Sequence, residues 1–526
     1  MTQIINPKFL QRCFRPKYKD LVAAKKLRVK GFYLKKIESI SNHQTIPGKI
    51  KCLTKANLDF SQTNSRYWNS LKTSYSLKNV TLNLDSEKTN IRILKKLAKG
   101  LRVIKIRFIC SEYSRPFLGK IYKILRYFQN LQVYDSDIVY SYSDPIFKEC
   151  HQIFLQNLQI TPNTNCDLLR QYFNVTQITQ FNTKKCYPHR KIMLPLKLQD
   201  LFPNLISLTL RLIQDHPKSF YTSLQESFPY LTSLKNFHLK ANTRSPEITE
   251  FLSSKQLLSL PLLDSLKIYL PFVSGSEMDL FNFLLQKQTD LINLSIIIPE
   301  GELHPSDSLK KLRFLELSSS NSLPFILSQS LANLESLTLS NLKDEFLDPQ
   351  RVIHFCEFLT KQKETLRSLV LGFGVVPETN ALNSLLISIS KLGQLKELNL
   401  SSIHLSSTED FQLKPTLLKL QKLENLKLSF RENESENENS CLSQILGILQ
   451  GLSSLKALKT LSFNFPVSKV PGYMEYMIQN ALSKLENLTM VAIETSCIFD
   501  DDDEEYLRKI VAKINLKQSQ KSILMF

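Results

Sequence analysis

A leucine pattern recurs along most of this chain, and it limits the folds that the chain can adopt. The pattern is L-x-x-L-x-L, as in "LKELNL" from Leu395, and it returns as "LENLKL" from Leu423. Clear copies start at Leu205, Leu234, Leu263, Leu291, Leu312, Leu334, Leu366, Leu395, Leu423 and Leu458. Weaker copies start at Leu77, Leu101, Leu131, Leu155, Val175 and Leu488. A recurring period of about 20–50 residues indicates a solenoid, in which each repeat packs on its neighbours.

Each repeat combines two kinds of apolar periodicity. In "LISLTL", Leu208 and Leu210 alternate with polar residues, and a period of two predicts a short strand with one buried face. Many strands are followed by segments in which apolar residues recur at helical spacing, as in residues 220–231, 382–392 and 442–452. A strand and a helix repeated in phase predict a parallel sheet with helices on its outer side.

The motif resembles the leucine-rich repeat family, in its longer ribonuclease-inhibitor-like form, over about residues 77–495. The resemblance implies an α/β solenoid, or horseshoe, with the parallel sheet on the concave face and helices outside. The family's usual Asn or Cys after the strand is mostly missing: Asn242 fits, but Ile403 occupies that place after "LKELNL". We therefore expect an irregular solenoid whose turns satisfy their backbone groups by other means.

Three repeats depart from the usual length. Those at Leu291 and Leu312 are 21 and 22 residues long, which leaves too little chain for a full helix. The long repeat at Leu423 contains "RENESENENS" (431–440), which is polar and charged and has no apolar period. We expect this segment to be an exposed loop.

The two ends of a solenoid need caps, because a terminal repeat would otherwise expose its apolar edge. We expect a basic N-terminal segment at 1–50, the solenoid at 51–499 and a C-terminal capping helix at 500–526. In the last segment an acidic run, 500–505, would begin the helix, where negative charge is favoured by the helix dipole. The apolar residues that follow share one helical face: Tyr506, Leu507, Ile510, Val511 and Ile514.

The N-terminal segment has three alternative interpretations. It can be a plain helical cap on the solenoid. The stretch "KYKDLVAAKKLRVKGFYLKKI" (17–37) also resembles the second half of an F-box, although "INPKFL" stands where the opening Leu-Pro would be. That resemblance implies a substrate receptor of a ubiquitin ligase. Residues 1–19 carry five basic residues and no acid until Asp20, which also fits a mitochondrial presequence interrupted by Pro7 and Pro16.

Charge is concentrated at the start of the chain. Residues 1–130 hold 29 Lys and Arg against 6 Asp and Glu, a net of +23, whereas the remainder holds 39 against 42, a net of −3. This asymmetry favours an acidic partner. The nine scattered cysteines indicate reduced thiols, so we expect an intracellular protein, cytoplasmic or nuclear, with a mitochondrial location as the alternative.

The sequence has no signature of catalysis. It contains only 12 glycines and no G-x-G-x-x-G, P-loop, H-E-x-x-H, C-x-x-C or G-x-S-x-G motif, and its eight histidines are isolated. We therefore predict no enzyme activity, no catalytic residues, no cofactor and no metal.

What remains is the surface made by strand residues that point away from the core. On the expected concave face the basic ones are Lys105, Arg107, Arg211, His238, Lys240 and Lys267, and further along the chain the face becomes small and neutral. We predict an adaptor or scaffold that binds an acidic protein there. The alternatives are the F-box-like receptor and a basic subunit of an organellar or nucleic-acid assembly. Nucleic acid is the weaker candidate because the aromatic residues among the basic ones are expected in a strand, for Phe108, or in a helix core, for Tyr127 and Phe128, and not where bases could stack on them.

Overall fold

The computed structural model describes the repeats in most detail from residue 178 onward. Before that point it describes only the backbone of five strands, and nothing in 1–54 or 496–526, where the expected caps lie. The remaining described residues are 178–183, 198–212, 218–241, 243, 245–272, 275–299, 302–304, 309–319, 321–329, 331–342, 348–375, 377–403, 412–431, 438–465, 477, 480–482, 484–485, 487–488 and 490–495.

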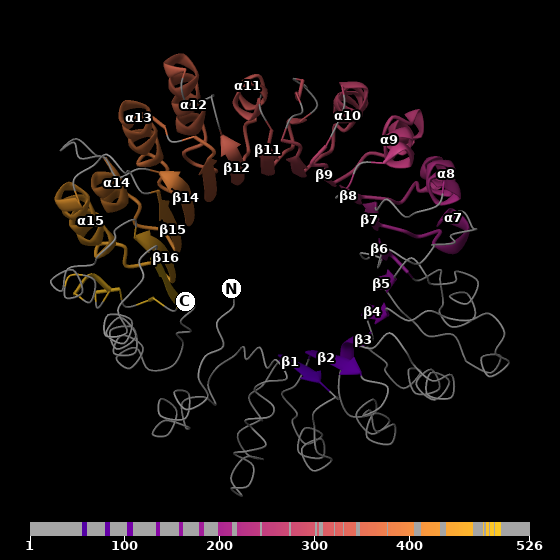
Figure 1. Cartoon of the computed structure of the whole chain (residues 1–526), viewed down its shortest axis with the longest axis horizontal. Coiled ribbons are helices and arrows are strands. Elements are labelled where there is room, and N and C mark those ends of the chain that lie inside the picture. Colours follow the sequence, from indigo (N-terminus) through magenta and orange to yellow (C-terminus); the bar gives the residue numbers. More distant parts are fainter. Residues whose placement is uncertain are drawn as a thin grey trace, which may run out of the picture. The chain divides into compact units, whose positions relative to one another are not determined.

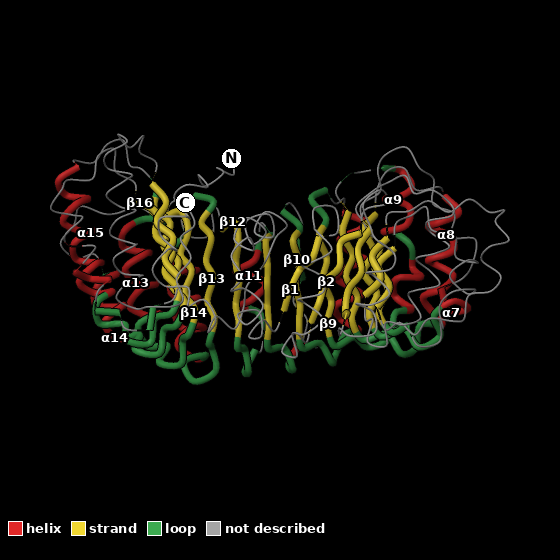
Figure 2. The backbone as a smooth tube through the Cα atoms, turned by 90° about the horizontal axis from the view of Figure 1, so that it is seen from below, coloured by secondary structure: helices red, strands yellow, loops and turns green. Residues whose placement is uncertain are grey.

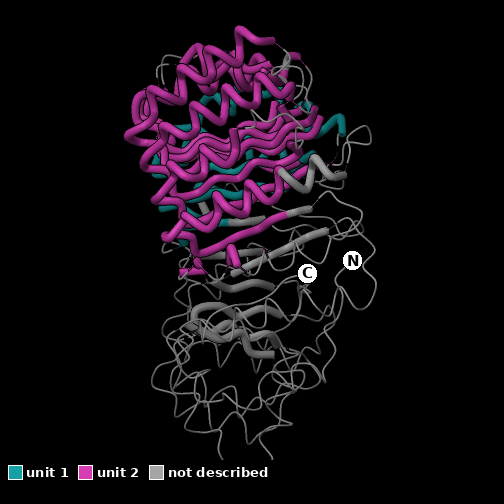
Figure 3. Tube along the Cα trace, turned by 90° about the vertical axis from the view of Figure 1, so that its left-hand side faces the viewer, with its two compact units in different colours: residues 1–239, 245–261 teal, residues 240–244, 262–526 magenta. Residues whose placement is uncertain are grey.

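The chain divides into two compact units, coloured separately in Figure 3. Unit 1 comprises residues 1–239 and 245–261, and unit 2 comprises residues 240–244 and 262–526. Each unit is a stack of repeats around a parallel sheet.

In unit 1, neighbouring strands pair in chain order and all pairings are parallel from β1 to β7. The strands are β1 (Lys55–Asp59), β2 (Asn79–Leu84), β3 (Val103–Phe108), β4 (Val133–Ser136), β5 (Asn157–Ile160), β6 (Gln180–Thr183) and β7 (Ser207–Leu212). β8 (Asn236–Ala241) runs across the boundary between the units. The described helices are α7 (Leu198–Leu201), α8 (Lys218–Ser227) and α9 (Pro246–Leu252), with 3-10 turns η6 (Phe228–Tyr230) and η7 (Lys255–Ser259).

In unit 2 the same parallel pairing continues from β9 to β17. The strands are β9 (Ser265–Tyr269), β10 (Asn293–Ile297), β11 (Phe314–Ser318), β12 (Ser336–Leu342), β13 (Ser368–Phe373), β14 (Glu397–Ile403), β15 (Asn425–Phe430), β16 (Thr460–Phe465) and β17 (Met490–Thr495). The described helices are α10 (Gly275–Lys287), α11 (Ser322–Leu327), α12 (Pro349–Lys361), α13 (Thr379–Ile389), α14 (Leu413–Lys419) and α15 (Glu438–Leu452). In Figures 1 and 2 these helices lie on one side of the strands.

The leucine pattern places the strands correctly, and the α/β leucine-rich repeat solenoid is confirmed. Every clear copy from Leu205 to Leu458 is followed two residues later by a strand. On β14, for example, Leu398 and Leu400 have no exposed surface, and they alternate with exposed or half-exposed residues. Leu395, which opens the motif, is equally buried. The uneven leucine spacing arises because Leu395 lies in the turn before the strand, Leu398 and Leu400 lie on the strand, and all three enter the same core.

Two expectations about the weaker copies need correction. The copy expected at Val175 is out of phase: β6 starts at Gln180, and the buried residues that precede and occupy it are Ile178 and Phe181. The structure also adds β1, after Leu53, before the first repeat that the pattern predicts.

Two helix boundaries also differ from the expected ones. The segment 431–440 is not all loop, because Glu438, Asn439 and Ser440 begin α15, while 432–437 lie outside the described residues. The helix expected at 382–392 is α13, which starts and ends three residues earlier.

Neither short repeat has a full helix among its described residues, as their length predicts: the second has only the six residues of α11, and the first has polar side-chain contacts instead. Between β10 and β11 the described residues contain no α-helix, and residues 302–304 are held by the side chains of Asn282 and Asn321. The Asn282 amide donates to the Glu302 carbonyl at 3.1 Å and accepts from the His304 N–H at 2.9 Å. Asn321 accepts from the Leu303 N–H and donates to its carbonyl, both at 3.0 Å.

Buried polar side chains at the ends of the helices join one repeat to the one before it. The Gln288 amide oxygen accepts from the Leu263 N–H at 2.7 Å, and the Gln362 amide donates to the Leu331 carbonyl. Ser227 accepts from the Leu198 N–H at 2.8 Å, and Thr416 donates to the Leu386 carbonyl at 2.9 Å. These bonds satisfy buried backbone groups between repeats, before the strands and in the helices.

Candidate functional site

One face of the sheet in unit 2 carries side chains that none of the described helices covers. On β12, Leu337 and Leu339 are fully buried, whereas Ser336, Thr338 and Ser340 between them are half-exposed. The helices of the unit lie on one side of the strands (Figure 1), so we infer that the buried leucines point toward them and that Ser336, Thr338 and Ser340 point away. We use the name sheet face for the residues of β9–β16 that point away from the helices, together with Lys240 of β8, because they are the part of unit 2 that can meet another molecule along many strands at once.

The parallel register arranges the sheet face in rows that run across the strands. The middle row consists of Lys267, Ser295, Glu316, Thr338, Val370, Asn399, Lys427 and Ser462. Adjacent strands lie about 4.8 Å apart, so neighbours in a row are in contact range of one ligand. From β12 to β16 the outward residues are mostly Ser, Thr, Asn and Gly, which confirms the small and neutral character expected for this part.

The six basic residues expected on the concave face fall in both units. Lys105 and Arg107 lie on β3, in register with Thr81 and Asn83 of β2; only the backbone of this strand is described. Arg211 on β7 and His238 on β8 belong to unit 1 and are half-exposed between buried neighbours. Lys240 and Lys267 belong to unit 2, where Lys240 is half-exposed and Lys267 exposed. Of the six, Lys240 and Lys267 therefore lie in the same unit. The role of all six residues in binding stays a prediction.

Sequence reasoning missed a group of apolar residues near these lysines. Tyr269 and Ile297 are half-exposed neighbours in register on β9 and β10, and the Lys240 Nζ lies 4.2 Å from the centroid of the Tyr269 ring. Phe314 opens β11 on the outward side and is 40% exposed, and Phe272, just after β9, is 55% exposed. The sequence did contain a signal for them. Tyr269, Ile297 and Phe314 are apolar residues at strand positions that, by the alternation of the strand, must point away from the core.

Hydrogen bonds between neighbouring strands order several polar residues of the sheet face. The Ser295 hydroxyl donates to Glu316 at 2.6 Å, and the Ser368 hydroxyl donates to Glu397 at 2.9 Å. Asn399 differs, because its side-chain oxygen is buried and accepts no hydrogen bond from the residues that the structure describes. A carboxylate at that position would therefore be poorly solvated.

Two β-bulges flank β13 on the sheet face. β12 and β14 each contain an extra residue before their last buried position, Leu342 and Ile403, and the register shifts there. The extra residues, Asn341 and Ser402, have positive φ values of 63° and 62°. Between them lies Gly372, where an added Cβ would come within 3.2 Å of the Ser401 Oγ. The backbone is thus bent and closely spaced at this end of the three strands.

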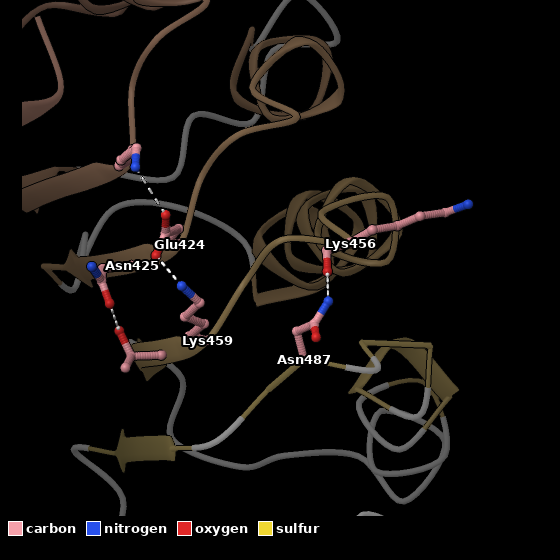
Figure 4. Close-up of polar contacts among 7 residues, drawn as sticks. Glu424, Asn425, Lys456, Lys459 and Asn487 are labelled. Carbon is pink, nitrogen blue, oxygen red and sulfur yellow. Dashed lines mark hydrogen bonds and ion pairs between the residues drawn. The ribbon is translucent and has the colours of Figure 1, made fainter.

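A ladder of ion pairs runs along the edge where the strands begin. The paired residues are those that immediately precede a strand. Backbone hydrogen bonds also join the residues at these positions from one repeat to the next. The Arg313 Nε donates to Glu335 at 2.8 Å, and Glu424 pairs with Lys396 at 3.3 Å and with Lys459 (Figure 4). A further bond between the segments that precede β16 and β17 comes from the Asn487 side chain, which donates to the Lys456 carbonyl at 2.8 Å (Figure 4).

The ladder predicts a pH-dependent contribution from Glu424. Hydrogen bonds from Lys459 and Lys396 hold the pKa of this carboxyl below its ordinary value of 4.5. A lowered pKa in the folded state stabilises the fold above the ordinary value, and the stabilisation is lost as pH falls through the lowered value. Glu424→Gln should therefore lower the melting temperature slightly at pH 7, since the pair is solvent-exposed, and the difference should vanish in acid. Melting curves across the acid range, with the exposed Glu364→Gln as control, test this; a difference that persists in acid would contradict it.

Three features of the described residues concern metal groups, membrane spans and the thiol of Cys356. They contain no group of three or more His, Cys, Asp or Glu placed to hold a metal ion. None of the helices in the described part of the chain has the length and hydropathy of a membrane span. Cys356 is half-buried in α12, and burial raises the pKa of its thiol, which disfavours a reactive thiolate.

Comparison with known proteins returned structural similarity only. No protein-family model matches the sequence, and no curated protein matches it. Among solved structures, a leucine-rich repeat protein of Leptospira interrogans, LIC12759, is 16% identical, with a TM-score of 0.28 and 98% of each chain covered.

Two further similar solved structures are complexes. The TLR13–ssRNA13 complex is 15% identical at a TM-score of 0.30, covering 91% of this chain and 62% of that one. The Drosophila Toll–Spatzle complex is 12% identical at a TM-score of 0.33, covering 92% of this chain and 66% of that one. Similarities this weak carry no argument about function, so the fold assignment rests on the repeat and on the structure itself.

Proposed function

We propose that this leucine-rich repeat solenoid is a non-catalytic adaptor or scaffold that binds another protein on its sheet face. The observation that carries the proposal is the array of half-exposed side chains in register from β9 to β16, on the side opposite the helices. Protein interfaces are broad surfaces with apolar anchors surrounded by polar groups. The sheet face offers hydroxyls and amides along its length and apolar residues at one end.

An acidic partner is part of the same proposal. The net charge of +23 in residues 1–130 supports it, together with Lys240 and Lys267 on the sheet face. Exposed charges act over about 8 Å at physiological salt, so they would speed encounter with an acidic protein more than they would hold it. We further propose an intracellular location, supported by the nine cysteines without close pairs.

The F-box-like interpretation concerns residues 5–40, which lie outside the described residues. It would make the protein the receptor subunit of a ubiquitin ligase and would use the same sheet face to hold the substrate. The sheet-face experiment below applies to both versions, because both require protein binding by the repeats.

The test is affinity capture with the full chain and two matched arginine substitutions. Thr338→Arg places a large charged side chain in the middle row of the sheet face, whereas Ile387→Arg places it on α13 at a residue that is 46% exposed. We expect Thr338→Arg to lose proteins that the unchanged chain and Ile387→Arg both retain, as identified by mass spectrometry. Equal capture by both variants, each with an unchanged melting temperature, would refute binding on this face.

Salt dependence tests the charge of the partner separately. Raising ionic strength from about 0.1 M to 1 M shortens the Debye length from about 10 Å to about 3 Å. Proteins captured through the basic residues should be released over this range. Capture that is indifferent to salt would remove the acidic partner from the proposal and leave the sheet face as the binding surface.

A further inference from the structure

We propose that binding on the sheet face is centred on one apolar and basic patch, and that the patch takes a short acidic peptide segment with an aromatic or large aliphatic side chain. The inference rests on the protein-binding role proposed above and specifies its site and ligand. We call this the Tyr269 patch, and it consists of six residues of unit 2: Lys240, Lys267, Tyr269, Phe272, Ile297 and Phe314.

Tyr269 is the centre of the patch because its ring is both accessible and held in place. It is the last residue of β9, in register with Ile297 on β10, and both are half-exposed between buried neighbours. The Lys240 ammonium lies 4.2 Å from the ring centroid, a cation–π contact that restrains the ring and keeps the positive charge beside it. Tyrosines that are ordered before binding lose little entropy in a complex, and they are enriched among residues that dominate binding energy.

The concentration of apolar residues here distinguishes the patch from the rest of the sheet face. Phe314 on β11 and Phe272 after β9 are 40% and 55% exposed. The residues that continue the Tyr269–Ile297 row toward β15 are Gly372, Ser401 and Ser429, beyond Ser318 on β11. Isolated exposed apolar residues are ordinary on protein surfaces. Here Tyr269, Ile297 and Phe272 lie at or just after the ends of β9 and β10, Phe314 lies at the opposite end of β11, and the two lysines are nearby, which together mark a contact surface.

The charges of the patch favour a carboxylate on the ligand. Lys267 is exposed and lies in register with Ser295, and no described residue forms an ion pair with it. The bordering acid, Glu316, already accepts the hydrogen bond from Ser295 at 2.6 Å. Arg313, near the Phe314 ring at 5.9 Å, is paired with Glu335. An incoming acid can therefore meet Lys267 and Lys240 without displacing an internal ion pair.

The dimensions of the patch fit a peptide segment better than a folded surface. The patch extends over four strands, β8 to β11, which lie about 4.8 Å apart and so span about 14 Å, and the five residues of β9 span about 13 Å. A stable interface between two folded proteins covers about 800 Å² on each partner, several times this area. A segment of a few residues, with one apolar side chain beside Tyr269 and acids beside the lysines, covers the patch.

The experiment selects peptides from a displayed library of random 12-residue sequences on the full chain and measures binding of the enriched peptides by fluorescence anisotropy. We expect enriched sequences to combine acidic with aromatic or large aliphatic residues. Tyr269→Ala and Phe314→Ala should each weaken binding about tenfold, and Lys267→Glu similarly. Tyr269→Phe, which keeps the ring, should bind almost like the unchanged chain.

Matched controls come from the outer helix α10. Phe283→Ala removes an aromatic side chain that is 60% exposed, and Lys287→Glu reverses an exposed lysine. Both should leave the affinity within about twofold. Each variant is compared with the unchanged chain by its melting temperature, so that a loss of binding is separated from a loss of folding.

The outcomes separate this inference from the broader function. No enrichment, enrichment of basic peptides, or binding that survives Tyr269→Ala and Phe314→Ala overturns the Tyr269 patch. If Ser401→Arg abolishes binding while the patch variants retain it, the sheet face still binds protein and only the assigned site is wrong. If the α10 controls weaken binding and neither Ser401→Arg nor the patch variants do, both proposals fail.

Discussion

Leu398→Asp should destabilise unit 2 by about 4 kcal/mol or more, the largest effect expected of any single substitution discussed for this sheet. Leu398 has no exposed surface, and it lies in register between Leu369 and Leu426 on the flanking strands. The substitution removes a packed side chain and introduces an acid with no described polar group placed to receive it. Hydrogen exchange should show faster exchange of the amides in β13, β14 and β15.

The control for Leu398→Asp is Lys427→Asp, on the next strand. Lys427 is exposed and points to the opposite side of the sheet, so the same acid meets water there and stability should change by at most about 0.5 kcal/mol. Asn399 is less suitable as a control, although it is adjacent, because its side-chain oxygen is buried. Equal damage from Leu398→Asp and Lys427→Asp would contradict the strand phase.

Phe251→Ala should cost unit 1 about 3–5 kcal/mol, because the residue lies in an aromatic cluster. Its ring has no exposed surface, and its centroid lies 5.5 Å from that of Tyr221 and 6.0 Å from that of Phe228. Phe228 in turn packs edge-on against Phe237 of β8 at 5.9 Å. Removing the ring opens a cavity between helix α9 and the neighbouring repeat, which the surrounding side chains can only partly close.

Tyr230→Ala is the matched control for Phe251→Ala, because Tyr230 lies in the same part of unit 1 and is 60% exposed. Its loss should change stability by no more than about 0.5 kcal/mol. Phe251→Leu, which fills most of the volume, should cost less than about 1.5 kcal/mol. Chemical denaturation followed by far-UV circular dichroism measures all three, and a Phe251→Ala variant as stable as Tyr230→Ala would show that this cluster is not packed as described.

The strands could be predicted because the alternation of leucines fixes both their position and the face they bury. The prediction was wrong where the third apolar residue is missing: after Ile178 and Phe181 the third core-facing position of the pattern is Thr183, so Val175 gave an equally plausible phase. β1 was missed for a similar reason, since Ala56 stands where a leucine would be. Residues 438–440 are polar and show no apolar period, so the sequence did not predict them to be helical. They form the first turn of α15, whose following residues carry the apolar spacing of a packed helix.

The candidate site was only partly predictable, because charge was used to find it. Lys240 and Lys267 were found as outward basic residues. Tyr269, Ile297 and Phe314 were not, because an apolar residue in a strand is ordinarily assigned to the core. The alternation within each strand marks these positions as facing away from the core, and the register adds that Tyr269 and Ile297 are neighbours. The cation–π contact between Lys240 and Tyr269 depends on side-chain positions that no spacing in the sequence reveals.

The hydrogen bonds that link one repeat to the next have a direction, and this bears on how the protein is made. Ser227, Gln288, Gln362 and Thr416 each complete the backbone of an earlier repeat, at separations of 29, 25, 31 and 30 residues. A ribosome adds residues at about 5–20 per second, so a newly made repeat waits a few seconds for its last polar partner. During synthesis the most recent repeat is always incomplete, and the growing end is the part that depends on protection from aggregation.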